Sequence, residues 1–184
     1  MKAVLVGRRK HLLDIIEIDL HTGMRKMELL SLHKSQLDFD RNSIHLAHTK
    51  NGKPRSIPIH DAIRPILLRL CDEAGPNGYL FENQKTGKPI RDIKSAWNTA
   101  IRLAGIAHIP FHCAGRHTFG TRAVDNGASL KDVQVIMDHA DIHTTMRYVH
   151  ATEPGKRRAV EAAARSSKVK RFVPDLYQKK SATG

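Results

Sequence analysis

The apolar pattern of this chain changes between residues 43 and 59, and this change most limits its possible folds. On both sides of the stretch, apolar residues recur at helical spacing, whereas residues 43–59 form two short extended runs around Asn51-Gly52. Asn-Gly between extended runs is the strongest short-range hairpin signal, because both residues tolerate positive φ. The sequence therefore predicts one small antiparallel β-sheet in a mainly helical chain, an α+β fold class.

Helices are expected on both sides of this hairpin, where apolar residues fall on one helical face. The first covers residues 11–20 and is broken at His21-Thr22-Gly23. The second covers residues 24–32, with Met24, Met27 and Leu30 turned inward. Later helices are expected over residues 63–70, 92–103, 116–126, 130–137 and 144–149. A short strand is expected at residues 79–81, between turns at residues 76–78 and 86–89.

The composition changes after Glu153-Pro154-Gly155. Residues 156–167 are rich in alanine and charged side chains and are predicted to form an extra helix. A basic tail follows, and we expect it to be disordered after about Val173. The predicted organisation is one domain over residues 1–153, followed by a C-terminal helix and basic tail over residues 154–184.

The net charge of +13 over 184 residues points to a polyanionic partner such as DNA, RNA or an anionic membrane. On charge alone, a ribosomal or merely basic protein is the competing interpretation. Apolar runs do not approach the roughly 18–20 residues of a membrane span, and the start of the chain lacks a signal-peptide pattern. Cys71 and Cys113 could form at most one bridge, so a reducing cytoplasmic location is expected.

Four segments carry the chemically informative residues, and their order along the chain is the informative feature. They are residues 21–30 with Thr-Gly-Met-Arg-Lys-Met-Glu, 49–55 with a hairpin lysine, 112–118 with His-Cys-Ala-Gly-Arg-His-Thr, and 138–150 with Asp-His and Thr-Met-Arg-Tyr. Together, over residues 10 to 150, they resemble the tyrosine recombinase, or phage integrase, family in its catalytic domain. Each motif alone is weak, but the ordered set is specific.

This resemblance implies an enzyme that cuts and rejoins double-stranded DNA through a 3′-phosphotyrosyl intermediate. Arg25 and Arg116 match the family's arginine pair, which binds the nonbridging phosphate oxygens with charge-assisted hydrogen bonds. Tyr148 matches the nucleophile, whereas Tyr79 is expected to pack in the core and Tyr177 lies in the tail. Phosphotyrosine exchange conserves the ester bond, so no cofactor is implied.

The remaining site residues follow from the same resemblance. Lys50 occupies the place of the hairpin lysine that protonates the leaving 5′ oxygen, and Lys53 is a neighbour that could replace it. Lys50, Lys53 and Arg55 are expected to bind DNA, although hairpin charges are often only solvated. His112 and His139 match the two histidines of proton transfer and phosphate binding. Glu28 matches the acid after the first arginine, and it is expected to support that arginine or a histidine.

Two departures from the family pattern affect these assignments. The family has H-x-x-R, whereas three residues separate His112 from Arg116 here, and we expect Gly115 to absorb the extra residue as a bulge. Asp138 stands where the family usually has glycine, and it could bind a histidine or oppose the phosphate. His117, directly after Arg116, is expected to be structural. If the bulge is not absorbed, the alternative is a DNA-binding module without catalysis; a type IB topoisomerase-like enzyme is a third possibility.

The resemblance also implies partners and boundaries. A homotetramer on DNA is expected, with residues 156–167 as the segment that docks on the next protomer. The chain begins almost at the start of the catalytic domain, so we expect the N-terminal DNA-clamping domain to be absent. No metal site is predicted, since neither H-E-x-x-H nor paired C-x-x-C occurs, although His112, Cys113 and His117 are close in sequence.

Overall fold

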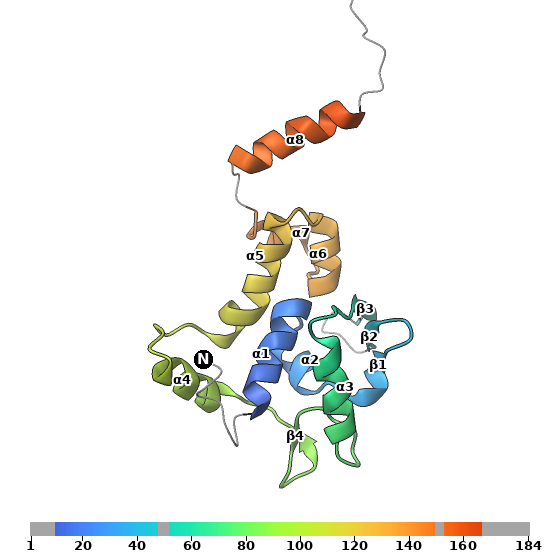
Figure 1. The fold of residues 1–184 in the computed structure, drawn as a ribbon, viewed down its shortest axis with the longest axis vertical. Helices are drawn as coiled ribbons and strands as arrows, with labels where there is room; N and C mark the ends of the chain where they lie inside the picture. The colour runs from blue at the N-terminus through green and yellow to red at the C-terminus, as the bar shows by residue number, and fades with distance from the viewer. Residues whose placement is uncertain (1–9, 48–51, 150–152, 167–184) are drawn as a thin grey trace, which may run out of the picture. The chain divides into compact units, whose positions relative to one another are not determined.

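The computed structural model describes residues 10–47, 52–149 and 153–166. The chain divides into two compact units, residues 1–149 and 150–184. Helix α8 (Glu153–Ser166) belongs to the second unit, and its described side chains from Lys156 to Ala164 are exposed. All other elements belong to the first unit (Figure 1).

The first unit is mainly helical, as predicted. Its helices are α1 (Lys10–Thr22), α2 (Lys26–Leu30), α3 (Arg64–Glu73), α4 (Lys94–Leu103), α5 (Thr118–Asp125), α6 (Leu130–Met137) and α7 (Ile142–Met146). A 3₁₀ turn, η2 (Lys34–Gln36), follows α2, and a π-helical turn, η3 (Cys113–His117), precedes α5.

Two small antiparallel sheets complete the unit. Strands β1 (Leu37–Asp38), β2 (Ser43–Leu46) and β3 (Arg55–Pro58) form one sheet in sequence order, with Ile44 opposite Ile57. Strands β4 (Glu82–Asn83) and β5 (Lys88–Pro89) form a separate hairpin. The predicted hairpin of residues 43–59 is therefore confirmed, while its turn at residues 48–51 lies outside the described residues.

Helix α1 lies in the middle of the unit and organises the core (Figure 1). Its apolar face packs with side chains from α2, the sheet, α3 and α4; the fully buried members include Ile15, Ile18, Leu29, Leu30, Ile44, Ile57, Leu67, Leu70 and Phe81. A second, smaller cluster holds Val133, Met137 and Tyr148, with Phe119 packed against them. The second cluster joins α5, α6 and the segment that follows α7.

Several predictions differ from the structure in detail. The helix expected over residues 24–32 has only five residues, and Met27, expected to be buried, is 47% exposed. The strand expected at residues 79–81 is wrong, because Tyr79 makes only a single bridge to His33 and the strand begins at Glu82. Strand β1 was not predicted. The tail after Val173 lies outside the described residues.

Two further findings concern the cysteines and membranes. Cys71 and Cys113 are both free thiols. None of the helices in the described ranges combines the length and the apolarity that crossing a bilayer requires.

Candidate active site

Arg25 lies at the N-terminus of α2, directly after the turn that ends α1. Gly23 makes this turn with φ at +58°, a conformation that glycine adopts without steric cost. The backbone N–H of Arg25 donates to Glu28 Oε2 at 2.9 Å, and its guanidinium donates to Glu28 Oε1 at 3.1 Å. The guanidinium also donates to the carboxylate and the carbonyl of Asp138, which ends α6. Arg25 therefore joins two segments that are 113 residues apart in the sequence.

Glu28 is held between two arginines. Arg55 donates from both terminal nitrogens to the carboxylate, at 3.1 and 2.6 Å, and from Nε to the Ile136 carbonyl at 3.0 Å. Burial alone would raise the pKa of Glu28, but hydrogen bonds from Arg55 and Arg25 outweigh it and lower the pKa. Glu28 therefore stays ionised and fixes both arginines.

Arg55 was predicted to bind DNA. In the structure its side chain is buried and does not lie open on the surface. Only 5% of its side chain is exposed, and its donors are used by Glu28 and Ile136. In this arrangement, Arg55 ties the hairpin strand β3 to α2 and α6. A direct contact with DNA stays a prediction for this residue.

Arg116 lies in the π-helical turn η3, which is where the extra residue was expected to be absorbed. A π turn holds one more residue per turn than an α-helix accommodates, and such bulges recur at functional sites. Gly115 is buried against Asp19 of α1. The Arg116 guanidinium donates to the carbonyls of Gly23 and Met137. The turn thus absorbs the insertion and still directs Arg116 toward the Arg25 turn and the end of α6.

His139 follows Asp138, whose backbone has φ at +51°. Nδ1 of His139 lies 2.9 Å from the hydroxyl of the buried Thr145 in α7, and this contact orients the imidazole. Burial, together with the charges of Arg116 and Arg25, lowers the pKa of His139 to about 4. His139 is therefore neutral at pH 7 and lies beside both arginines.

Tyr148 is 4% exposed and lies between α5 and His139. Its ring stacks on the His139 ring, with centroids 6.2 Å apart and planes at 18°. Gly120 lets the phenol approach α5, because a Cβ there would lie 2.8 Å from the ring. The hydroxyl forms a hydrogen bond of 3.0 Å with Nδ1 of His117. Burial raises the pKa of Tyr148, although Arg116 and Arg147 act in the opposite direction.

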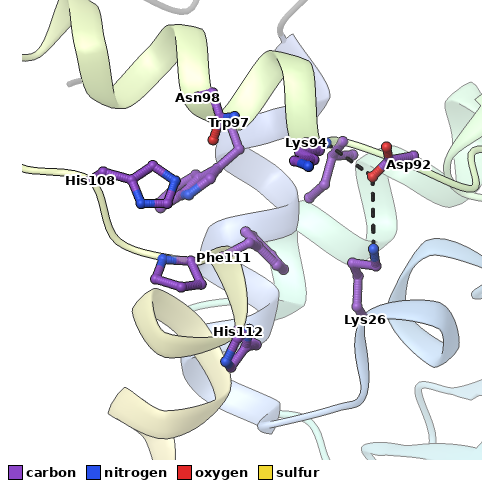
Figure 2. A pocket seen from close by; sticks show the side chains of 10 residues that line it. Lys26, Asp92, Lys94, Trp97, Asn98, His108, Phe111 and His112 are labelled. Atoms are coloured by element: carbon purple, nitrogen blue, oxygen red, sulfur yellow. Dashed lines mark hydrogen bonds and ion pairs between the residues drawn. The ribbon is translucent and has the colours of Figure 1, made fainter.

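His112 is exposed, and its ring lies 5.4 Å from the His117 ring. Figure 2 shows His112 at one end of a pocket that also includes Phe111, Trp97 and Lys26, and Lys26 pairs with Asp92 at 3.7 Å. Its neighbour His117 is the residue whose Nδ1 contacts the Tyr148 hydroxyl. The structure brings it to the edge of the site.

Within the described residues, His112, Cys113 and His117 are the group whose donor atoms come close enough to consider for a metal, within 4.8 Å of one another. Nδ1 of His117 is already directed at the Tyr148 hydroxyl. We assign no metal to this group, and the expectation of a metal-independent site stays a prediction.

Two lysines of the hairpin, Lys50 and Lys53, were expected at the leaving 5′ oxygen. Lys50 lies outside the described residues. Lys53 is exposed and lines a hollow together with Arg55, Lys131, Asp138 and His139. Two of the cations expected near DNA, Lys53 and Arg55, therefore border the same hollow as the candidate phosphate-binding histidine.

Asp19 and His117 are the site residues that sequence reasoning missed. Asp19 is 1% exposed, and its carboxylate accepts a hydrogen bond from the Arg116 backbone. The sequence did contain a signal for Asp19: it is an acidic residue on the apolar face of α1, four residues after the fully buried Ile15. His117 was expected to be structural, and its contact with Tyr148 depends on the π turn, which no local pattern specifies.

Comparison with known proteins agrees with this geometry. The model of the phage integrase family matches residues 7–154. The tyrosine recombinase XerC of Bacillus pumilus is 32% identical over 157 residues, covering 78% of this chain and 50% of that protein. XerC of Corynebacterium glutamicum is 29% identical over 153 residues, covering 80% and 48%. The chain spans about half the length of the curated relatives it matches.

Solved structures give the same result. The integrase of transposon Tn1549 in complex with circular intermediate DNA aligns with a TM-score of 0.69 at 27% identity, covering 88% of this chain and 63% of that chain. The catalytic domain of bacteriophage HP1 integrase aligns with a TM-score of 0.63 at 26% identity, covering 90% and 89%. With a family model that matches most of its length and a site built from the same ordered motifs, this chain belongs to the phage integrase family.

Proposed function

We propose that this chain is the catalytic part of a site-specific tyrosine recombinase that cuts and rejoins double-stranded DNA. The observation that carries the proposal is the convergence of three segments that are distant in the sequence, at residues 25, 116 and 137–148. Arg25 and Arg116 both bind the end of α6 at Met137 and Asp138, and the next residue, His139, stacks on Tyr148. Two cations, a neutral imidazole and a phenol are the groups that phosphodiester transesterification requires.

The proposed reaction is a direct exchange of phosphate esters. The Tyr148 oxygen attacks the scissile phosphorus, the bond to the 5′ oxygen breaks, and a 3′-phosphotyrosyl link forms. Arg25, Arg116 and His139 bind the nonbridging oxygens, where negative charge increases in the transition state. A 5′ hydroxyl of a partner strand then attacks the phosphotyrosine and releases Tyr148. The relatives named tyrosine recombinase support this assignment.

The leaving 5′ oxygen must receive a proton, and we assign this role to Lys50 of the hairpin. An ammonium on a flexible stem can follow the strand during cleavage. Lys53, in the described part of the same hairpin, is the replacement donor. His112 is assigned to proton transfer at the edge of the site, and Glu28 is assigned to holding Arg25.

We propose a homotetramer on DNA as the working assembly, with residues 156–167 as the docking segment. In the described part of α8, Val160 is 72% exposed, which leaves an apolar side chain for such a contact. The net charge of +13 supports DNA as the polyanion, because phosphate neutralisation releases counterions. A cytoplasmic location follows from this substrate.

The test is covalent trapping on nicked duplex DNA from which cleavage releases a short fragment, so that religation cannot occur. A random-sequence pool is incubated with the chain, and protein-linked DNA is detected on a denaturing gel. We expect a DNA-linked band that Tyr148→Phe abolishes. Tyr79→Phe is the matched control, because it removes the same hydroxyl from a tyrosine outside the site.

The other outcomes separate the competing functions. A band that survives Tyr148→Phe would assign the nucleophile elsewhere. Salt-sensitive DNA binding without a band, also after fusion to an N-terminal DNA-binding domain of a XerC relative, would favour a binding module without catalysis. Multiple-turnover relaxation of supercoiled DNA without strand exchange between two duplexes would favour a topoisomerase-like enzyme.

A further inference from the structure

The phenol of Tyr148 is directed at an imidazole and is enclosed by protein. Its oxygen lies 3.0 Å from Nδ1 of His117, within ordinary hydrogen-bond distance. Gly120 borders one side of the ring, and the His139 ring stacks at 6.2 Å. With an exposed fraction of 4%, the side chain has little access to solvent as a proton acceptor. A proton leaving this oxygen therefore has His117 as its nearest protein acceptor among the described residues.

We propose that His117 is the general base that accepts the phenol proton of Tyr148 during attack on the phosphate. The proposal rests on the recombinase function proposed above. As the bond from oxygen to phosphorus forms, the O–H bond breaks and the proton moves to Nδ1. The electron pair of the broken P–O bond leaves on the 5′ oxygen, which takes its proton from another donor. In the rejoining step, when a 5′ hydroxyl attacks the phosphotyrosine, protonated His117 returns the proton to the departing Tyr148 oxygen.

The surroundings give His117 the required protonation state. Burial lowers the pKa of its imidazole, and the neighbouring charges of His112, Arg147 and Arg116 lower it further. His117 is therefore neutral at pH 7 and carries a lone pair. The same burial raises the pKa of Tyr148, so the phenol does not ionise by itself near neutral pH. A phenol that stays protonated next to a neutral imidazole is the starting state of general-base catalysis.

The π turn provides this geometry. His117 is the last residue of η3, and Arg116 precedes it, so one turn presents the phosphate-binding cation and the proton acceptor in succession. The His112 ring lies 5.4 Å from the His117 ring, on the exposed side. This assigns His112 a place behind His117 rather than at the phosphate.

The competing interpretation is a latch, in which the hydrogen bond only stores Tyr148 in a withdrawn position. The two roles predict opposite effects. Loss of a general base slows cleavage by about 10²- to 10⁴-fold. Loss of a latch frees the nucleophile, so cleavage becomes faster or stays the same.

The experiment replaces His117 by asparagine and measures single-turnover formation of the covalent complex, with a chelator present throughout. Asparagine keeps a hydrogen-bond acceptor near the position of Nδ1 but cannot accept a proton at neutral pH. We expect His117→Asn to slow cleavage by at least about 100-fold. His143→Asn is the matched control, because it removes an imidazole that is 73% exposed on α7.

A rescue experiment separates proton transfer from a merely structural role. Tyr148 is replaced by a trifluorinated tyrosine, whose phenol ionises near neutral pH and needs no base. We expect this substitution to restore most of the cleavage lost in His117→Asn. It should not restore cleavage in Arg116→Ala, because that variant lacks a phosphate contact. His117→Gln serves as the second variant if His117→Asn does not fold.

Each result decides the question. Cleavage by His117→Asn that equals or exceeds wild type overturns the general base. A slow variant that the fluorinated tyrosine does not rescue also overturns it and assigns His117 a structural role. If the wild-type chain forms no covalent complex, fails to do so after fusion to the relative's N-terminal domain, and only binds DNA, the recombinase function fails together with this proposal. An active wild type with an unaffected His117→Asn overturns the proposal about His117 alone.

Discussion

The carboxylate of Asp19 lies against Gly115, so closely that a Cβ on residue 115 would overlap its Oδ2. The same carboxylate accepts a hydrogen bond from the backbone of Arg116. A buried acid on α1 therefore packs where the π turn has no side chain, directly beside Arg116. This relationship explains how the π turn with three residues between His112 and Arg116 packs against α1.

Gly115→Ala is expected to destabilise the protein by about 1–3 kcal/mol, because the added methyl group has no room beside Asp19. Chemical denaturation measures the change in the free energy of unfolding. The same substitution in an Asp19→Ala background should cost clearly less, since the opposing carboxylate is gone. Equal costs in the two backgrounds would show that Asp19 is not what confines residue 115.

Stability should depend on pH through Asp19. Burial is the largest cause that raises its pKa from 3.8 to about 7, while the charge and the backbone N–H of Arg116 act in the opposite direction. The folded protein therefore binds this proton more tightly than the unfolded chain does. The contribution of Asp19 to stability falls as the pH rises from about 4 to about 7 and is constant above that range.

Asp19→Asn removes this titration. We expect its free energy of unfolding, relative to wild type, to increase between pH 4 and pH 7.5 by up to about 4 kcal/mol. Denaturation curves at several pH values give the difference. Asp14→Asn is the control, because it makes the same substitution on the same helix. Asp14 differs from Asp19 in that it forms an ion pair with Arg69 at 2.6 Å. A difference between Asp19→Asn and wild type that does not change with pH would contradict the prediction.

Asp138→Gly is expected to strengthen DNA binding and to accelerate cleavage, each by roughly tenfold. A tenfold change corresponds to about 1.4 kcal/mol in the free energy of binding or of activation. The Asp138 carboxylate pairs with the Arg25 guanidinium, which we propose to bind the phosphate. Glycine adopts the positive φ of this position readily, so the fold should be retained. Binding is measured by fluorescence anisotropy over a series of salt concentrations.

The control for Asp138→Gly is Asp61→Asn, which removes one negative charge from an exposed position. An equal gain in affinity for the two variants would mean that only net charge matters. A loss of affinity in Asp138→Gly would mean that Asp138 holds Arg25 in its binding position rather than competing with phosphate.

Arg55→Ala is expected to cost about 1.5–3 kcal/mol of stability, because it removes two charged hydrogen bonds to Glu28 and leaves only Arg25 as its partner. Thermal and denaturant unfolding measure this loss. Arg41→Ala, which removes an arginine that is 82% exposed, should change stability by less than about 0.5 kcal/mol. If Arg55→Ala left stability unchanged but reduced the salt dependence of DNA binding, Arg55 would be a phosphate contact.

Much of the fold could be predicted from local sequence. The helices α1, α3 and α4 carry apolar residues at helical spacing over ten or more residues, and their buried faces follow that pattern. The hairpin followed from Asn51-Gly52 between extended runs. Short elements were less predictable: α2 has five residues, too few for periodicity to exclude Met27 from the core.

The ordered motifs also predicted which residues meet. Arg25 and Arg116 lie on separate segments, His139 and Tyr148 lie on a third, and the structure links them through the end of α6. Their roles at the phosphate remain predictions, and Lys50 lies outside the described residues.

Tertiary structure alone decided the protonation chemistry and the surroundings of these groups. Whether Arg55 faces solvent or Glu28, whether Asp19 lies under the π turn, and whether His117 meets the Tyr148 hydroxyl all depend on contacts between segments distant in sequence. The pKa of each group is set by burial and by charges from other elements, and neither is encoded in the residues adjacent to it. The sequence by itself determined the secondary-structure elements and the identity of the reactive groups. Packing determined which of these groups form hydrogen bonds or ion pairs with one another.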